Sequence, residues 1–309
     1  MSRLRKYKPF ARAAAIDMMA YRFNILTWAV VTVAEVACLI FLWLAVYQSS
    51  EGGIDASING FTYKEMISYV VLTTIFGFVT FNDDTLWFIN RDIRQGTIGN
   101  FLIKPISYRG KFIASNVGAF LMMSLMFGIP LYAAGLGVLI GIGFLPVTSV
   151  WDFIAHFGLF LIASVLACLL NGVISYIFGI LCFYTTSAWG LNSLKTTVIS
   201  FLSGTLLPIA FFPNIFREIV SYMPFAGMSQ NPILILMMKY SYLECAKVIL
   251  ISFAWLILLE LIGKLLFNHA IKNMEQSAQA LEIKKERIEI IESFLYSNLD
   301  IMLRLIQVK

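Results

Sequence analysis

Long apolar runs alternate with short polar segments along most of the chain. A helix that crosses a bilayer needs about 20 predominantly apolar residues, and six runs meet this requirement. Asp83 and Asp84 interrupt the second run, and the third and fourth are long enough to tilt or to extend beyond the bilayer. The pattern predicts six transmembrane helices, at about residues 25–47, 66–89, 112–142, 153–184, 191–212 and 245–270.

The amino-acid composition narrows the class of protein further. Hydrophobic residues make up 59% of the 309 positions and charged residues 13%, whereas soluble domains carry roughly 25% charged residues. This balance excludes a soluble enzyme, a disordered chain and a nucleic-acid binder. The four cysteines share no CxxC spacing, so the sequence indicates neither a metal site nor a disulfide framework. We expect an all-α polytopic membrane protein.

The basic residues set the orientation of the helices, because Lys and Arg accumulate in cytoplasmic loops. The loop between the first two runs holds only Lys64, and the loop between the third and fourth runs holds none. The N-terminus and the second loop are therefore expected in the cytoplasm, and six crossings return the C-terminus there. The basic residues are Arg3, Arg5, Lys6, Lys8, Arg12 and Arg22 before the first run, and Arg91, Arg94, Lys104, Arg109 and Lys111 in the second loop.

Two cytoplasmic segments are amphipathic. Residues 7–23 mix apolar and basic positions, which fits a helix lying in the membrane interface; a frayed basic tail is the alternative. Residues 91–105 hold Gly96 and Gly99 and end at Pro105, which stops a helix. This second segment fits either a helix parallel to the membrane that presents a contact surface or a solvated loop, and physical chemistry alone does not favour one.

Two further segments are not plain spans. Residues 206–232 hold four prolines, and the helix expected at 213–222 is too short to cross, which predicts a re-entrant helix in the outer leaflet. Residues 272–309 are charged and repeat Leu281, Ile288, Leu295 and Met302 every seven positions, which predicts a cytoplasmic amphipathic helix or short coiled coil. The expected domains are an N-terminal segment (1–24), a membrane domain (25–271) and a cytoplasmic tail (272–309).

Two stretches carry a family resemblance. Residues 96–108 spell GTIGNFLIKPISY, and residues 207–239 place an apolar proline, FFP, a short helix, MPF and NPI in that order. Both stretches resemble the permeases of ABC exporters and lie where that family has them, and the resemblance covers about residues 7–270. It implies that residues 7–23 form an elbow helix, that the helix after Pro213 is re-entrant, and that the second loop is a coupling helix. The residues assigned to coupling are Arg91, Arg94, Gly96, Thr97, Gly99, Lys104 and Pro105.

The resemblance also implies partners and a mechanism. Two permease chains, the same or different, would pair with two ATPase subunits in a bacterial cytoplasmic membrane, with both termini cytoplasmic. ATP and Mg²⁺ would be bound by the ATPase and no cofactor by this chain. ATP would close the ATPase dimer, the coupling helices would transmit the movement, and the permease interface would open outward to export a substrate. The tail after residue 271 departs from the family pattern.

Polar residues inside the expected spans are the remaining candidates. Glu35 lies near the middle of the first span, where a carboxylate usually faces a cavity, a bundle interior or a partner. It is assigned either to the translocation path or permease interface, together with Asn171, Pro208 and Pro213, or to a local structural pairing. Glu260 lies one helical turn before Lys264, so these two are expected to neutralise each other.

Catalytic chemistry finds little support. No GxxxxGK[ST] motif is present, so this chain is not expected to bind ATP through a phosphate loop. His156 and His269 have no acidic or thiol neighbour at metal-ligand spacing. Asp83 and Asp84 favour a hydrated helix end over an acid pair. Two alternatives stay open: a secondary transporter using Glu35 as an ion site, and a lipid-processing membrane enzyme using Asp83 and Asp84.

Overall fold

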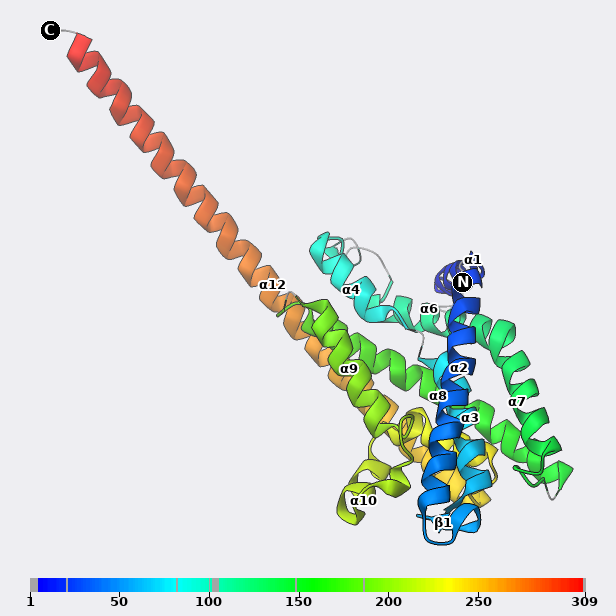
Figure 1. Ribbon diagram of the computed structural model, residues 1–309. Helices are drawn as coiled ribbons and strands as arrows, with labels where there is room; N and C mark the ends of the chain where they lie inside the picture. Colours follow the sequence, from blue (N-terminus) through cyan, green and yellow to red (C-terminus); the bar gives the residue numbers. More distant parts are fainter. Residues whose placement is uncertain are drawn as a thin grey trace. The chain divides into compact units, whose positions relative to one another are not determined.

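The computed structural model describes residues 5–20, 22–81, 83–99, 101, 106–147, 149–185 and 187–307; for residues 22, 25, 275 and 277–307 it describes the backbone only. The chain divides into two compact units, Met1–Gly263 and Lys264–Lys309. The helices (Figure 1) are α1 (Lys8–Ala20), α2 (Arg22–Ser49), α3 (Tyr63–Thr80), α4 (Thr85–Arg94), α6 (Tyr108–Met123), α7 (Ile129–Gly141), α8 (Val150–Leu181), α9 (Ala188–Leu202), α10 (Asn214–Tyr222), α11 (Gln230–Leu236) and α12 (Tyr242–Gln307).

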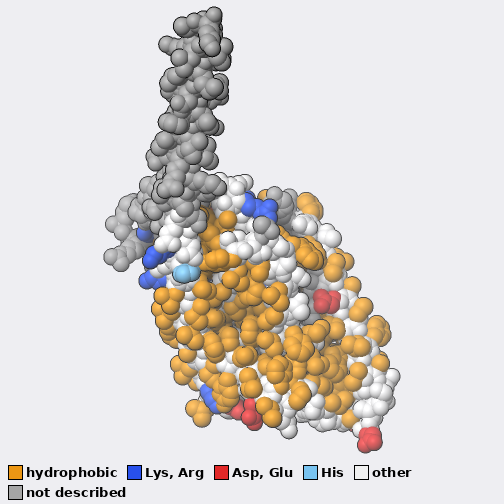
Figure 2. Space-filling view, turned by 90° about the vertical axis from the view of Figure 1, so that its left-hand side faces the viewer, with side chains coloured by type: hydrophobic (Ala, Val, Ile, Leu, Met, Phe, Trp, Pro, Cys, Tyr) orange, Lys and Arg blue, Asp and Glu red, His pale blue; other side chains and the backbone are white. Residues whose placement is uncertain are grey.

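Five helical segments among the described residues are long and apolar enough to cross a membrane. Figure 2 shows the consequence for one face of the first unit, where hydrophobic side chains form a broad cover and the charged ones lie mostly near its upper and lower margins. The chain is therefore a multi-pass membrane protein, as its hydropathy predicts. The five segments are Leu26–Ser49, Tyr63–Arg94, Tyr108–Gly141, Val150–Leu181 and Tyr242–Met274.

The fifth of the six expected spans has a different structure. In place of one helix over residues 191–212, α9 is a helix of 15 residues that ends at Leu202. At 1.5 Å per residue this helix is about 22 Å long, shorter than the roughly 30 Å hydrocarbon core. Gly204 then adopts a positive φ of 81°, and Pro208 precedes a short 3₁₀ turn, Ile209–Phe211. The count of six membrane-spanning helices is thus not confirmed.

One end of the first unit is built around a β-hairpin, β1 (Ser57–Ile58) and β2 (Phe61–Thr62). Its two-residue turn, Asn59–Gly60, has positive φ at both positions, which suits the twist of a tight hairpin. The Lys239 ammonium donates to the Gly60 carbonyl at 3.1 Å and pairs with Glu65 at 3.0 Å. We call this the hairpin end, and the start of α12 lies there.

The α7–α8 connection also belongs to the hairpin end. The Tyr242 hydroxyl, at the start of α12, donates to the Asp152 carboxylate of α8 at 2.7 Å. The Ser68 hydroxyl of α3 contacts the Phe144 carbonyl at 3.4 Å. At the opposite end, which we call the α4 end, α4 lies beside residues 182–185, which follow α8. Figure 1 shows α4 and β1 at opposite ends of this unit.

The core of the first unit lies where α11 inserts between α3 and α8. Every residue of α11 is buried, and Ile233 and Leu236 join the cluster that contains Phe76 of α3 and Phe160 of α8. Four of the seven residues of α11 are Ile or Leu, and the burial of such side chains stabilises the core. This helix holds the chain at the hairpin end just before α12 begins.

At the N-terminus, α1 packs closely against α6. Tyr7 lies over Gly110, where a Cβ atom would meet its ring at 2.8 Å, and the Ser107 amide donates to the Tyr7 hydroxyl at 3.0 Å. About two helical turns further along α6, a Cβ atom at Gly118 would overlap the backbone of Ala11. The two glycines therefore let the two helical backbones approach, as small residues do in membrane helix packing.

This packing makes a stability prediction. Gly118→Ala should destabilise the membrane unit by about 1–3 kcal/mol, since the added methyl group meets backbone that cannot rotate away. Gly158→Ala is the matched control, because nothing lies within 4 Å of a Cβ atom there and alanine favours a helix. Thermal unfolding in detergent should show a lower midpoint for Gly118→Ala alone; equal midpoints would contradict this view of the contact.

In the tail, the backbone of α12 continues as a helix to Gln307. The side chains of the seven-residue repeat, Leu281, Ile288, Leu295 and Met302, lie outside the described residues, so the amphipathic surface stays a prediction.

Candidate functional site

The coupling residues expected from the sequence gather around the end of α4. Leu86 and Ile89 bury one side of this helix, while Arg91 and Arg94 are exposed. The helix stops at Gln95, and Gly96 turns the chain with a φ of 67°. Thr97 lies in the same turn and Gly99 directly follows it, so five of the seven expected residues lie close together in the chain. The other two, Lys104 and Pro105, lie outside the described residues.

A buried carboxylate fixes this turn. Asp92 is 5% exposed; it accepts hydrogen bonds from the Tyr108 hydroxyl at 3.0 Å and from the Thr97 hydroxyl at 3.3 Å. Lys111 supplies the countercharge at 3.4 Å. Buried charges are retained when they are paired and hydrogen-bonded. Asp92 therefore ties the turn after α4 to the start of α6, and it makes this surface a preorganised one.

The exposed side of α4 borders a groove. Asn90, Ile93 and Arg94 face residues 182–185 across a space of about 490 Å³. The Arg94 guanidinium donates to the Asn90 side chain at 3.3 Å, which holds it along the helix. Burial raises the pKa of the Cys182 thiol in the same groove, against the opposing effect of Arg94. The groove thus carries one cationic side chain, Arg94, and is formed by α4 and the connection after α8, which are far apart in the sequence.

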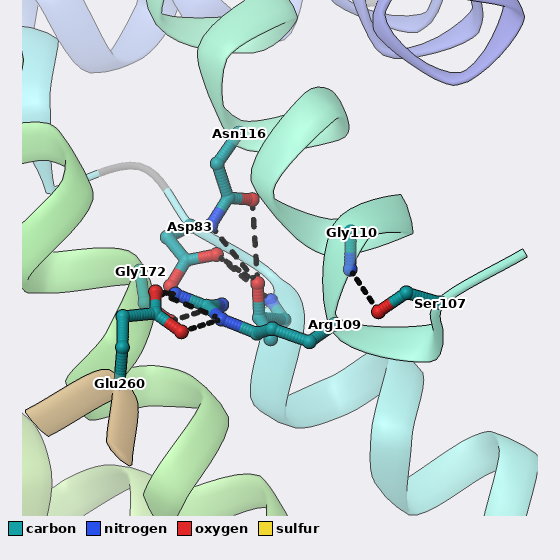
Figure 3. A network of polar contacts seen from close by, with 8 residues as sticks. Asp83, Ser107, Arg109, Gly110, Asn116, Gly172 and Glu260 are labelled. Carbon is teal, nitrogen blue, oxygen red and sulfur yellow. Dashed lines mark hydrogen bonds and ion pairs between the residues drawn. The ribbon is translucent and has the colours of Figure 1, made fainter. Parts of the chain in front are cut away.

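One arginine, Arg109, joins three helices between the α4 end and the membrane interior. Arg109 of α6 binds the Glu260 carboxylate of α12 through two of its nitrogens, with Nε 3.1 Å from both oxygens, and donates to the Gly172 carbonyl of α8 at 3.1 Å. Its guanidinium also lies 4.9 Å from the centre of the Tyr176 ring. Figure 3 shows the Arg109 side chain reaching toward Glu260 and Gly172.

This contact corrects one expectation from the sequence. Glu260 does not rely on Lys264, its neighbour one turn along α12, since its carboxylate is occupied by Arg109. The planar guanidinium fits a carboxylate with two parallel hydrogen bonds, which a lysine cannot match. The pair therefore fastens α12 to α6 and α8.

The two aspartates between α3 and α4 do not form an acid pair of the catalytic kind. Asp83 accepts from the Thr85 amide at 3.0 Å and from the Thr85 hydroxyl at 2.6 Å, so it stabilises the start of α4. The Asn116 side chain of α6 donates to the same hydroxyl at 3.1 Å (Figure 3). Asp84, which precedes Thr85, makes no cap hydrogen bond to the helix. This arrangement favours a structural role over hydrolysis.

The four residues assigned to a path or interface are not brought together. Glu35 is exposed on α2, whereas Asn171 is 2% exposed inside α8 and donates to the Thr80 carbonyl at 3.5 Å. Pro208 is buried and Pro213 exposed in the connection from α9 to α10. Glu35 is thus the one charged residue of the four, and its side chain is exposed on the membrane helix α2.

Sequence reasoning missed a buried lysine. Lys195 on α9 is 6% exposed, and its ammonium donates to the Ser175 hydroxyl of α8 at 3.0 Å. A lone cation within an apolar run is the signal that could have found it, because intramembrane charges nearly always have partners. Asp92 was also missed, because it is an acidic residue between two arginines in a segment that was interpreted as a basic surface.

Five apolar helical segments long enough to cross a membrane define the described part of the chain as a multi-pass membrane protein. The model of the ABC-2 family transporter proteins matches residues 33–278, and the chain belongs to that family. No curated protein and no solved structure matches the chain. Family membership identifies the chain as an ABC permease subunit and a transporter component rather than an enzyme.

Proposed function

We propose that the chain is the permease subunit of an ABC exporter, driven by a separate ATPase subunit that docks on the α4 end. The observation that carries this proposal is the exposed cationic side of α4 held in place by the buried Asp92. A surface that transmits force needs a fixed geometry, and the contacts of Asp92 with Tyr108 and Lys111 supply it. In this proposal ATP and Mg²⁺ are bound by the ATPase, and this chain holds no cofactor.

The proposed topology has six crossings in a bacterial cytoplasmic membrane, with both termini and the α4 end cytoplasmic. The connection between α8 and α9 lies beside α4, whereas residue 239, before α12, binds the hairpin. The chain between these points must therefore pass from one end of the unit to the other. α9 and the segment after it, together with α11, make this fifth crossing in our proposal, α1 acts as the elbow helix and α10 as the re-entrant helix.

The polar face of α9 and the carboxylate of Glu35 on α2 support a path between two permease chains. Asn192, Ser193, Thr196, Thr197 and Ser200 fall on one side of α9, and each is exposed or half-buried. A polar face on a membrane helix is turned toward a water-filled cavity or a partner helix. We assign this face, with Glu35 of α2, to the translocation path or the permease–permease interface, whether the two permeases are the same or different.

Reconstitution tests the proposal. The permease co-expressed with the ATPase encoded beside it should purify as one complex, and the complex in vesicles should hydrolyse ATP faster than the ATPase alone. A permease that never co-purifies with an ATPase, and whose presence leaves hydrolysis unchanged, would refute the assignment.

Glu35 gives a separate prediction for the path. Glu35→Gln keeps the size of the side chain and removes its charge, so we expect an intact complex with altered transport. Glu51→Gln is the control, because Glu51 is equally exposed but lies after the end of α2. Substrate-dependent ATP hydrolysis should change for Glu35→Gln and not for Glu51→Gln; identical behaviour would leave Glu35 without a role in the path.

A further inference from the structure

An apolar groove of about 260 Å³ lies among α3, the α6–α7 junction and α8, and none of the residues assigned to coupling or to the path lines it. Its walls include Phe76 of α3, Tyr132 and Leu136 of α7, and Phe160 of α8. The groove follows α7 from Gly128 to Leu136, about 12 Å of helix. It lies within three of the segments that are long and apolar enough to cross a membrane.

The groove opens at the surface and reaches the interior. Ile129 and Leu161 at its mouth are 60% and 50% exposed, whereas Phe76 and Phe160 inside it are 2% and 4% exposed. A molecule that enters the groove from the side of the helical bundle can therefore contact side chains that are otherwise buried.

The local backbone explains why a hollow exists at this place. Pro130 has no N–H group, so it removes one hydrogen bond of the helical ladder, and the turn before it, Ser124–Gly128, widens into a π-helix. Such bulges are frequent at functional sites. Gly128 then contributes no side chain toward Val79, so the space beside α3 stays unfilled.

The surface around the mouth identifies the medium that it meets. No exposed residue of α7, or of residues 154–165 of α8, carries a polar side chain. This face differs from α9, whose exposed side is rich in Ser and Thr. Water does not fill an apolar cavity, and unfilled space next to closely packed side chains forfeits dispersion energy.

We propose that this groove holds one acyl chain of a phospholipid from the surrounding bilayer. The occupant must be apolar, slender and present at membrane depth, and a lipid acyl chain meets all three conditions. A bound chain would fill the gap beside the π-helix and so support the packing of α7 on α3 and α8. The proposal depends on the membrane location of the chain and not on the ATPase.

Two neighbouring alanines offer a matched pair of variants. Ala133 lines the groove and Ala134 does not, yet both are exposed on α7. Ala133→Trp should fill the groove without displacing core residues, whereas Ala134→Trp should place the same ring in the lipid. The thermal midpoints of the two variants in detergent establish that both are folded.

The probe is phosphatidylcholine with a diazirine on one acyl chain, in nanodiscs that contain the full-length permease. After illumination, we expect label on the peptides that hold Phe76 and Phe160 in wild type and Ala134→Trp, and loss of that label in Ala133→Trp. Label confined to exposed residues such as Ile162 would overturn the proposal. So would labelling of Phe160 that persists in Ala133→Trp.

Discussion

Arg109→Ala is expected to cause the largest loss of stability of any single substitution considered for this chain. It would leave the Glu260 carboxylate without its bidentate partner and the Gly172 carbonyl without its donor. Breaking a buried ion pair costs about 3–5 kcal/mol. Because the Glu260 side chain is 31% exposed and that of Arg109 13%, solvent reduces the cost, and we expect about 2–4 kcal/mol.

A mutant cycle separates the pair from its surroundings. The double variant Arg109→Ala/Glu260→Ala should be more stable than Arg109→Ala alone, because it removes the charge that would be left unpaired. Lys264→Ala is the control for the partner that the sequence suggested, and its thermal midpoint should stay near that of wild type. A midpoint for Lys264→Ala as low as that of Arg109→Ala would mean that the lysine shares the pair.

The comparison of Lys264 with Arg109 shows what a linear pattern can and cannot predict. Spacing along one helix correctly indicates which side chains are within reach, but it says nothing of a residue 151 positions away. Arg109 was counted only as a topological charge, and the fold turns it toward α12. Tertiary partners of this kind require knowledge of which helices are neighbours.

The apolar pattern predicted the spans well where a run is helical throughout, as in α2 and α8. It failed after Leu202, because hydrophobicity measures the preference of a segment for the membrane and not its backbone conformation. Gly204 and Pro208 end the helix although residues 206–212 remain apolar. The π-helical turn before Pro130 was not predicted, for the same reason.

The sequence marked the residues of the turn after α4 but not the side chain that anchors it. The arginines and glycines of residues 91–99 marked the segment, and the fold places them together at the end of α4. Asp92 is acidic within a basic stretch, and sequence alone does not say that it is turned inward toward Tyr108. The buried Asp92 carboxylate fixes the turn that carries the exposed residues. The geometry of this surface therefore depends on tertiary contacts, which the sequence alone does not show.

Gly96→Val should uncouple the permease from its proposed ATPase. Gly96 has a φ of 67°, and no other group lies within 4 Å of a Cβ atom there, so backbone conformation alone is at stake. A β-branched residue at positive φ costs at least about 1–2 kcal/mol. If the turn relaxes to avoid that strain, the docking surface moves, and a loss of about 1.4 kcal/mol weakens docking about tenfold.

Gly99→Val is the matched control for this substitution, because Gly99 directly follows the same turn, also has open space at its Cβ position, and has no positive φ. Both variants should insert and express alike, since neither touches a span. Substrate-stimulated ATP hydrolysis by the purified complex should fall about tenfold for Gly96→Val at limiting ATPase concentration and much less for Gly99→Val. Excess ATPase should restore part of the rate, because the defect is in docking and the catalytic sites are unchanged. Equal rates in the two variants would show that the turn geometry fixed by Asp92 does not transmit the movement, and coupling would then have to pass through the opposite wall of the groove, at residues 182–185.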